Sequence, residues 1–521
     1  MKRCLLVLLT ASLATRSLIA FPAFPAPQPL DSAGAARTLS QITPAKYPGA
    51  TAVIAYDRQR EEYTGTGTSV LERAVLVKTL SELGVRDWAQ LRVSYSPQYD
   101  RAEFLWARLI KASGEIIPLA VDSVQDTPQP AAEWGTIFWG DRDKTLTVLG
   151  LEPGDAVEYA TRGLGGLWRG PGSLRDSLAL LDQLATPYRG QFNRLVMFQD
   201  DQPVREMSYA VSGPNTLPLK FAVFNGALDH DVSADSFTTT HRWSAHDVPA
   251  VVDEPRMPSR YDVGLKLIVT TVPSWEWMSR FDYDQADSCL RPDQAIRDKA
   301  AELTAGLADD RSKVRALCYY VAHTIRYLGL AVGDAEGYQP HPARMTFVQK
   351  AGVCKDKAGL LVALLNAAGF RAWYTTTAAG NRIEDIPADQ ANHAIVAFED
   401  GRGGIDYCDP TMATETMEVL PAFERRQQVL IARPEGDRLR QIPLLPADSN
   451  RLEVSDRCAI DTLGNITGTL TLRGSGGQDD DLRGQFWQPR PAWDRIALDI
   501  VRQLGTAASV TSFTHTDPDS F

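Results

Sequence analysis

One stretch of the sequence limits the fold more than any other: AGVCKDKAGLLVALLNAAGF, residues 351–370. Nearly every residue of 358–365 is apolar, so a helix here would be apolar on all sides. Such a helix has to be buried within a domain, because a surface helix keeps one polar face. Asn366 and Gly369 are typical of a helix end. The stretch therefore predicts a buried helix that begins near Cys354.

Cys354 stands at the N-terminus of this expected helix, where the helix dipole and unpaired N–H groups favour negative charge. A thiolate is stabilised at such a position, and the adjacent Lys355 and Lys357 are expected to stabilise it further. Gly352 permits a tight turn into the helix. Free cysteine is also a common core residue, so a packed structural thiol is the alternative. The choice depends on whether the chain supplies a partner for the thiol.

Two downstream segments place polar side chains at the ends of expected strands. NHAIVAF puts His393 at the start of one strand, and GIDYCDPT puts Asp409 at the end of another. His393 lies 39 residues after Cys354 and 16 residues before Asp409. Two adjacent antiparallel strands would bring His393 and Asp409 side by side, and a helix packed on them would bring Cys354 next to His393. A thiolate nucleophile needs such a base or imidazolium partner, which in turn needs an orienting acceptor.

The 521 residues are too many for one ordinary domain, and length alone suggests about three. Residues 39–285 consist mostly of short strand patterns broken by Pro and Gly, which predicts a β-rich, sandwich-like N-terminal domain. Two short helices are expected within it, at 68–83 and 88–90. Helices followed by strands over 286–446 predict an α+β core domain. Alternating residues over 447–521 indicate the start of a C-terminal β-type domain that the chain need not complete.

The N-terminus has the pattern of an export signal. Residues 1–20 combine Lys2 and Arg3 with an apolar run and then small residues, as a signal peptide does. Residues 21–38 follow as a Pro-rich linker with extended backbone and no core. No later stretch is long and apolar enough to span a bilayer. We therefore expect an exported protein, periplasmic or extracellular, whose mature chain has no membrane span.

The cysteine count leaves at least one thiol unpaired. Without Cys4, an odd number of cysteines remains for pairing within the chain. These cysteines are Cys289, Cys318, Cys354, Cys408 and Cys458. Cys318 lies on the apolar stripe of an expected helix and is predicted to be a core residue. Cys408 adjoins Asp409 and is either paired with another cysteine or packed in the sheet, so the disulfide pairing stays open.

Composition and motifs exclude several classes of function. The net charge of −11 argues against a nucleic-acid-binding surface, which would usually be basic. The other histidines form no spaced ligand set such as H-E-x-x-H, so we expect no metal site. The glycine-rich GLGGLWRGPG lacks a P-loop lysine, and we expect no cofactor. The aromatic side chains of Trp275, Trp277 and Phe281 are expected in a core rather than on a ligand platform.

Taken together, GVCKDKAGLLVALLNAAGF, NHAIVAF and YCDPT resemble the transglutaminase-like superfamily of Cys-His-Asp enzymes. The upstream IRYLGLAVGDAEGYQPHPARMTF resembles one bacterial, exported branch, in which a β-rich N-terminal domain of unknown function precedes the core. LEPGDAVEYATRG and DEPRMPSRYDVGLKLIVTTVPSWEWM are similar to recurring segments of that domain. The resemblance covers nearly the whole mature chain. It implies a papain/transglutaminase-like fold for the α+β core.

The resemblance also implies roles for individual residues. Cys354 would be the nucleophile, His393 the base and imidazolium, and Asp409 the orienting acceptor, in acyl transfer through a thioester. The Cys354 backbone N–H is one candidate donor to the oxyanion, and Gln339 in GYQPHPA is a second. Many relatives have an acidic residue directly before the cysteine, where this chain has Val353. The loss of a nearby negative charge favours the thiolate.

The sequence leaves the acyl acceptor open. We expect hydrolysis of a peptide or amide bond, because nothing in the sequence provides a dedicated amine site. One alternative is a true transglutaminase or acyltransferase that cross-links envelope peptides. Another is a non-catalytic binding module with a relic triad, although a relic need not retain all three residues. The expected partner is a peptide or protein substrate, with the cell envelope as one source, and neither nucleic acid nor oligomeric state is indicated.

Overall fold

The computed structural model describes residues 27–97, 101–130, 136–138, 140–165, 188, 190–330, 339–413, 417, 419–487, 490–503 and 505–517. The expected signal peptide and the first residues of the expected linker lie outside this part of the chain. Among the described residues, no helix combines the length and the apolar character that a membrane crossing requires.

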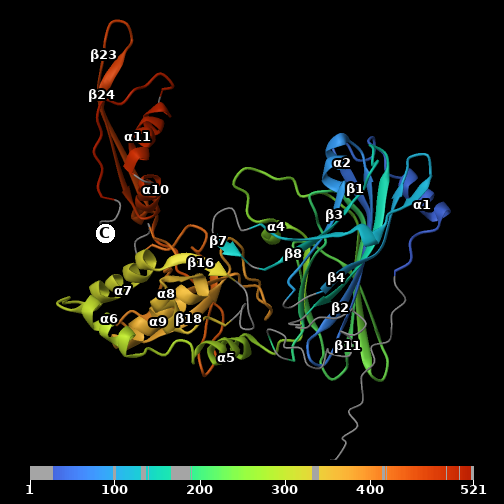
Figure 1. The fold of residues 1–521 in the computed structure, drawn as a ribbon, viewed down its shortest axis with the longest axis horizontal. Helices are drawn as coiled ribbons and strands as arrows, with labels where there is room; N and C mark the ends of the chain where they lie inside the picture. Colours follow the sequence, from blue (N-terminus) through green and yellow to red (C-terminus); the bar gives the residue numbers. More distant parts are fainter. Residues whose placement is uncertain are drawn as a thin grey trace, which may run out of the picture.

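The N-terminal region is built on one eight-stranded sheet (Figure 1), in the order β13–β14–β11–β1–β2–β9–β4–β5. Neighbouring strands are antiparallel except for the parallel pair β1 and β11. The strands are β1 (Ala52–Tyr63), β2 (Ser69–Thr79), β4 (Arg101–Ile110), β5 (Ile116–Pro118), β9 (Ala156–Gly165), β11 (Val204–Pro214), β13 (Asp229–Ala234) and β14 (Thr238–Val248).

Two three-stranded sheets cover this large sheet and close the sandwich. One has the order β10–β15–β12, and the other β3–β8–β6. A single buried cluster joins all three sheets, with Tyr209 from the large sheet, Leu267 from β15 and Leu146 from β8. The sandwich-like β domain predicted from the sequence is therefore confirmed. The strands are β3 (Gln90–Tyr95), β6 (Gln125–Pro128), β8 (Arg142–Thr147), β10 (Asn193–Met197), β12 (Lys220–Phe224) and β15 (Lys266–Thr270).

The helix expected at 68–83 is wrong over most of its length, because β2 occupies Ser69–Thr79. Val75 and Val77 are fully buried in this strand, which pairs with β1 on one side and β9 on the other. β-Branched residues fit such a pleated, two-sided environment, and strand pairing overrides a weak local helix preference. The helical segments of this region are α1 (Ser32–Ser40), α2 (Glu82–Trp88), the 3-10 turn η1 (Val121–Ser123) and α4 (Arg260–Val263).

The core domain is organised around the helix that the sequence predicted to be buried. This helix, α9, begins at Cys354, and its residues from Ala358 to Leu365 are almost completely inaccessible. It packs against α6, α7 and α8 and against strands β18 and β19. The helices are α5 (Trp275–Ala286), α6 (Gln294–Thr304), α7 (Asp310–Thr324), α8 (Ala343–Gln349) and α9 (Cys354–Ala367).

Helix α5 falls where the sequence suggested extended segments. Its aromatic residues Trp275, Trp277 and Phe281 pack with buried Tyr188 and Leu430, as the prediction of a core role requires.

A five-stranded antiparallel sheet forms the other layer of the core, in the order β20–β19–β18–β21–β22. Its strands are β18 (Ala372–Thr377), β19 (His393–Glu399), β20 (Ile405–Cys408), β21 (Gln428–Ile431) and β22 (Arg440–Gln441). A separate sheet, β17–β16–β7, joins the core to the N-terminal region, because β7 pairs in parallel with β16. Its strands are β7 (Thr136–Phe138), β16 (Arg326–Leu330) and β17 (Ala351–Gly352).

The loop between β18 and β19, residues 378–392, also contacts the N-terminal region. Ile386 and Ala388 of this loop form a buried cluster with Ile268 of β15. The buried Glu384 carboxylate lies 2.8 Å from the ammonium of Lys266, which is 1% exposed. The loop that ends at His393 is therefore held by a sheet of the N-terminal domain.

The C-terminal segment is partly as expected. It begins with the hairpin of β23 (Arg451–Ile460) and β24 (Ile466–Ser475), which projects away from the core in Figure 1. Helices α10 (Gly477–Phe486) and α11 (Trp493–Arg502), which the β-type prediction did not include, follow this hairpin. Short 3-10 turns lie at η3 (Ala447–Ser449) and η4 (Arg490–Ala492).

Candidate active site

The start of α9 is fixed by a compact turn around Cys354. Asp356 Oδ2 accepts a hydrogen bond from the Val353 N–H at 3.0 Å, which satisfies one of the N–H groups at the helix entrance. A Cβ at Gly352 would lie 2.6 Å from the Asp356 Cβ, so only glycine fits this entry. Cys354 is half-buried at the first position of the helix, as the sequence predicted.

The two expected strands bring His393 and Asp409 together. Strands β19 and β20 are antiparallel neighbours, so the start of one lies beside the end of the other. His393 Nε2 is 3.0 Å from Asp409 Oδ2. The Thr411 N–H and hydroxyl each donate to the Asp409 carboxylate at 2.8 Å, which fixes its orientation. Asp409 is therefore oriented as an acceptor for the Nε2 proton of His393.

The Cys354 sulfur lies at the other side of the His393 ring. Burial opposes ionisation of the thiol, but hydrogen bonding and charge from His393 outweigh it and lower the pKa of Cys354. The Tyr327 hydroxyl and the Ala394 N–H also donate to the sulfur. Because Nε2 faces Asp409, the remaining ring nitrogen, Nδ1, is the one that serves the thiol.

The electrostatics of His393 favour the imidazolium. Burial alone would lower its pKa, but the charge of Asp409 and the hydrogen bonds to Asp409 and Cys354 raise the pKa well above the usual range. Asp409 behaves in the opposite sense, because the positive charge of His393 outweighs burial and lowers the pKa of its carboxyl group. The arrangement thus favours a thiolate, an imidazolium and a carboxylate in one buried row.

Two residues of the site escaped the sequence reasoning. Tyr327 of β16 lies against Cys354, and burial together with the thiolate charge raises the pKa of its phenol. Glu424 is completely buried, with Oε1 3.2 Å from His393 Nε2. Tyr327 lies within the segment IRYLGL, and Glu424 within PAFERRQQ, neither of which forms a chemical motif. Only the fold brings them to the site.

The lysines predicted to support the thiolate have other partners. Lys357 Nζ donates to the carbonyls of Ala322 and Ile325 at 3.1 and 2.7 Å, at the end of α7. Burial lowers the pKa of Lys357 to about 8. Lys355 is buried too, and its charge helps to lower the pKa of Asp356. The main influences on the thiol are burial, His393, Tyr327 and Ala394 rather than the lysines.

The second oxyanion candidate also has another contact. Gln339 Nε2 donates to the Cys289 sulfur at 3.4 Å. The neighbouring His341 binds Asp356 Oδ1 through its N–H and Nδ1, at 2.9 and 3.0 Å. This loop therefore buttresses the start of α9. The Cys354 backbone N–H donates to the Tyr327 hydroxyl, and that hydroxyl donates to the Cys354 sulfur.

The other cysteines in the described part of the chain are all free thiols. Cys318 and Cys408 are buried next to each other, and the hydrogen bond between their thiols, together with burial, raises the pKa of Cys408. Cys408 is thus packed in the sheet, one of the two alternatives for it. Cys458 is exposed on β23.

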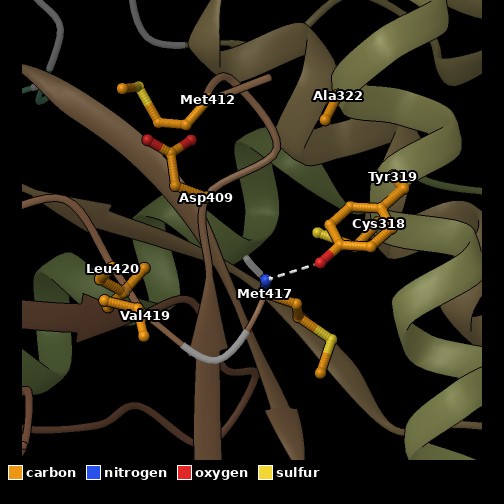
Figure 2. Close-up of a pocket in the computed structure, with 8 residues that line it drawn as sticks. All are labelled: Cys318, Tyr319, Ala322, Asp409, Met412, Met417, Val419 and Leu420. Atoms are coloured by element: carbon orange, nitrogen blue, oxygen red, sulfur yellow. Dashed lines mark hydrogen bonds between the residues drawn. The ribbon is translucent and has the colours of Figure 1, made fainter. Parts of the chain in front are cut away.

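A small cavity lies beside Asp409 (Figure 2). Its volume is about 10 Å³, room for roughly one water molecule. The Met417 N–H donates to the Tyr319 hydroxyl at 3.4 Å across one side of it. The cavity is too small for a substrate, so a substrate does not reach Asp409 through it. It is lined by Cys318, Tyr319, Ala322, Asp409, Met412, Met417, Val419 and Leu420.

One group of potential ligand atoms stands out among the described residues. Donor atoms of His393, Asp409 and Glu424 all lie within 4.8 Å of one another. A cation bound by these three atoms would displace the Nε2 proton and uncouple His393 from Asp409. The spacing equally suits a proton shared among hydrogen-bonding groups, and this interpretation keeps the His393–Asp409 contact intact.

Comparison with known proteins places both domains. Residues 65–252 match DUF3857, a domain of unknown function with a solved structure. Residues 297–406 match the transglutaminase-like superfamily. Cys354 and His393 lie inside this second match, and Asp409 lies just beyond it. The comparison with curated proteins gave no match.

One solved structure shares the fold. A crystal structure from Parabacteroides distasonis ATCC 8503, provisionally described as a protease, has a TM-score of 0.60 and 16% identity, over 79% of this chain and 78% of that chain. One from Cytophaga hutchinsonii, provisionally described as a cysteine protease, has 14% identity over 55% of this chain and 92% of that chain. Its TM-score of 0.21 is too low to support an argument. The two family matches show that the chain contains a transglutaminase-like superfamily domain that follows a DUF3857 domain.

Proposed function

We propose that this chain is an exported cysteine hydrolase that cleaves a peptide or amide bond through a thioester on Cys354. The observation that carries the proposal is the position of His393 between the Cys354 thiol and the Asp409 carboxylate, with Nε2 3.0 Å from Oδ2. A nucleophile, a base and an orienting acceptor in this order are what acyl transfer by cysteine requires.

The first half of the reaction forms the thioester. The Cys354 thiolate attacks the carbonyl carbon, and the carbonyl oxygen becomes an oxyanion. The candidate donors to that charge are the Tyr327 hydroxyl, which donates to the sulfur in the free protein, and the Cys354 N–H, which donates to that hydroxyl. One such donor typically contributes about 3 kcal/mol. The His393 imidazolium then gives its proton to the leaving amine as the carbon–nitrogen bond breaks.

The second half returns the enzyme to its starting state. Neutral His393 removes a proton from water, and the resulting hydroxide attacks the thioester carbon. The carbon–sulfur bond breaks, the acid product leaves, and the thiolate forms again beside the imidazolium. An amine in place of water would give a new amide, which is the transglutaminase outcome.

The test compares wild type with Cys354→Ala on three substrates: casein, a glutamine-donor peptide offered with a labelled amine, and peptides from the cell wall. We expect products that have gained the mass of water in the wild type and none in Cys354→Ala. Cys458→Ser is the matched control, because this exposed thiol lies on β23 and should leave turnover unchanged. Incorporation of the amine would favour a transglutaminase, and equal inactivity of both proteins on every substrate would favour a binding module.

Export is tested separately. We expect the mature protein in the periplasm or the medium, with an N-terminus near residue 20, as cell fractionation followed by N-terminal sequencing would reveal. A chain that keeps its first residues in the cytoplasm would contradict this part of the proposal.

A further inference from the structure

Glu424 is a buried carboxyl group that the mechanism above does not use. It is 0% exposed, and neither of its oxygens has a hydrogen-bond partner of good geometry among the described residues. Its Oε1 nevertheless lies 3.2 Å from His393 Nε2. Burying an ionised carboxylate without hydrogen bonds is costly, so this group needs either a proton or a different partner.

The surroundings of Glu424 favour the proton. His393 Nε2 has two carboxyl groups beside it, Asp409 at 3.0 Å and Glu424 at 3.2 Å. If both were ionised, one imidazolium would face two negative charges in a buried site, and like charges at this distance cannot both persist. The Cys408 thiol, whose pKa is raised, interacts with both carboxyl groups, and the charge of Lys357 acts on Asp409.

The two carboxyl groups differ in how readily they hold a proton. Burial and the charge of Asp409 raise the pKa of Glu424 to about 8. Asp409, which is closer to the imidazolium and also accepts from Thr411, has its pKa lowered. Near neutral pH the pair thus holds one proton, and it resides on Glu424.

We propose that Glu424 is a positioning residue for His393: as a neutral carboxylic acid it donates a hydrogen bond to the Asp409 carboxylate, and the two groups together form one singly charged acceptor for the His393 Nε2–H. Glu424 touches no reacting atom in this arrangement. It fixes the orientation of the Asp409 carboxylate relative to the imidazole ring, as supporting groups around functional histidines do. The inference rests on the proposed role of His393 but not on any particular substrate.

The first experiment measures how fast iodoacetamide alkylates Cys354, by peptide mass spectrometry at about pH 6, with exposed Cys458 as the reference thiol in the same chain. Glu424→Gln keeps a neutral donor and should react within about threefold of wild type. Glu424→Leu fills the space without a donor and should react about tenfold more slowly. Glu453→Gln, on exposed β23, is the matched control. A folded Glu424→Leu variant that reacts as fast as wild type would overturn the proposal.

The second experiment remains decisive if Glu424→Leu does not fold. The infrared difference spectrum of wild type minus Glu424→Gln should show the carbonyl band of a protonated carboxylic acid at neutral pH. This band should disappear as the pH rises through about 8. Carboxylate bands at neutral pH in its place would contradict the proposal. Neither experiment measures turnover, so the hydrolase proposal and this inference fail independently.

Discussion

The Cys354 sulfur is stabilised by His393 and by hydrogen-bond donors rather than by the adjacent lysines. His393, the Tyr327 hydroxyl and the Ala394 N–H all stabilise its negative charge, and together they outweigh the burial that would keep the thiol neutral. Hydrogen bonds to a charged atom are stronger than those between neutral groups. The reactivity of this residue therefore depends on groups from two other segments, around Tyr327 and His393, that are far from it in the sequence.

The lowered pKa of Cys354 predicts rapid alkylation in mild acid. At about pH 6 we expect Cys354 to react with iodoacetamide at least about tenfold faster than exposed Cys458, because an ordinary thiol is almost fully protonated there. Peptide mass spectrometry measures both rates in one sample. His393→Ala should remove the difference. Equal rates in the wild type would contradict a low thiol pKa.

Tyr327→Phe tests the phenol separately from the histidine. The change removes one hydrogen bond to the thiolate, worth about 1.5–3 kcal/mol, so we expect the Cys354 pKa to rise by about one unit or more. The pH dependence of alkylation measures this shift. An unchanged profile would show that the Tyr327 hydroxyl does not stabilise the thiolate.

Some residues of the site were predictable from local sequence patterns, and others were not. Cys354, His393 and Asp409 each occupy the end of a strongly patterned element, so the helix and strand patterns located them. Tyr327 and Glu424 reach the site only through tertiary packing, which no local pattern encodes. Lys357 is the opposite case. Its closeness to Cys354 in the sequence suggested that it supports the thiolate, but its ammonium donates to carbonyls at the end of α7.

At the scale of elements, helix α9 determines the construction of the core. It touches α6, α7 and α8 on one side and strands β18 and β19 on the other, so its position sets that of Cys354 relative to His393. Lys357 ties α9 to α7, since its ammonium caps carbonyls that the end of α7 leaves unpaired. The buried helix was predictable from its composition, but this cross-link between helices was not.

Lys357→Met should destabilise the core by about 2 kcal/mol, because two buried carbonyls lose their donor. The loss should also depend on pH. The folded-state pKa of Lys357 is about 8 against an ordinary value of 10.5, so between these values the unfolded chain binds more protons. The stability that Lys357 contributes therefore rises as the pH increases from about 8 towards 10.5.

Urea unfolding of wild type and Lys357→Met at pH 7 and at pH 10 measures this effect. The difference in free energy of unfolding between the two proteins should be larger at the higher pH. A difference that is the same at both pH values would show that the Lys357 pKa is not lowered by folding.

At the scale of the molecule, the N-terminal domain is fastened to the core at several points. Strand β7 extends the sheet that carries Tyr327, and the 378–392 loop packs on β15 through Ile386 and Ala388. The Lys266–Glu384 pair is buried at the same contact. The sequence predicted two domains in this order, but their interface is built from loops and short strands that have no sequence signature.

Glu384→Ala should loosen this interface. It leaves the Lys266 ammonium buried without its carboxylate, which typically costs about 3–5 kcal/mol. The double variant Lys266→Met/Glu384→Leu replaces the pair with apolar groups and should recover most of the loss. Thermal unfolding and limited proteolysis of the 378–392 loop measure both variants. If the single variant is as stable and as resistant as wild type, the pair does not hold the domains together.

The loop over 378–392 is attached to β15 in its middle and to His393 at its end. His393 is therefore tethered to the neighbouring N-terminal domain. A cut that separates the two domains would remove the contact that holds the 378–392 loop. His393 would then no longer be held next to Cys354. Many proenzymes gain activity when a protease removes their N-terminal part, and for this chain we expect the same cut to abolish it.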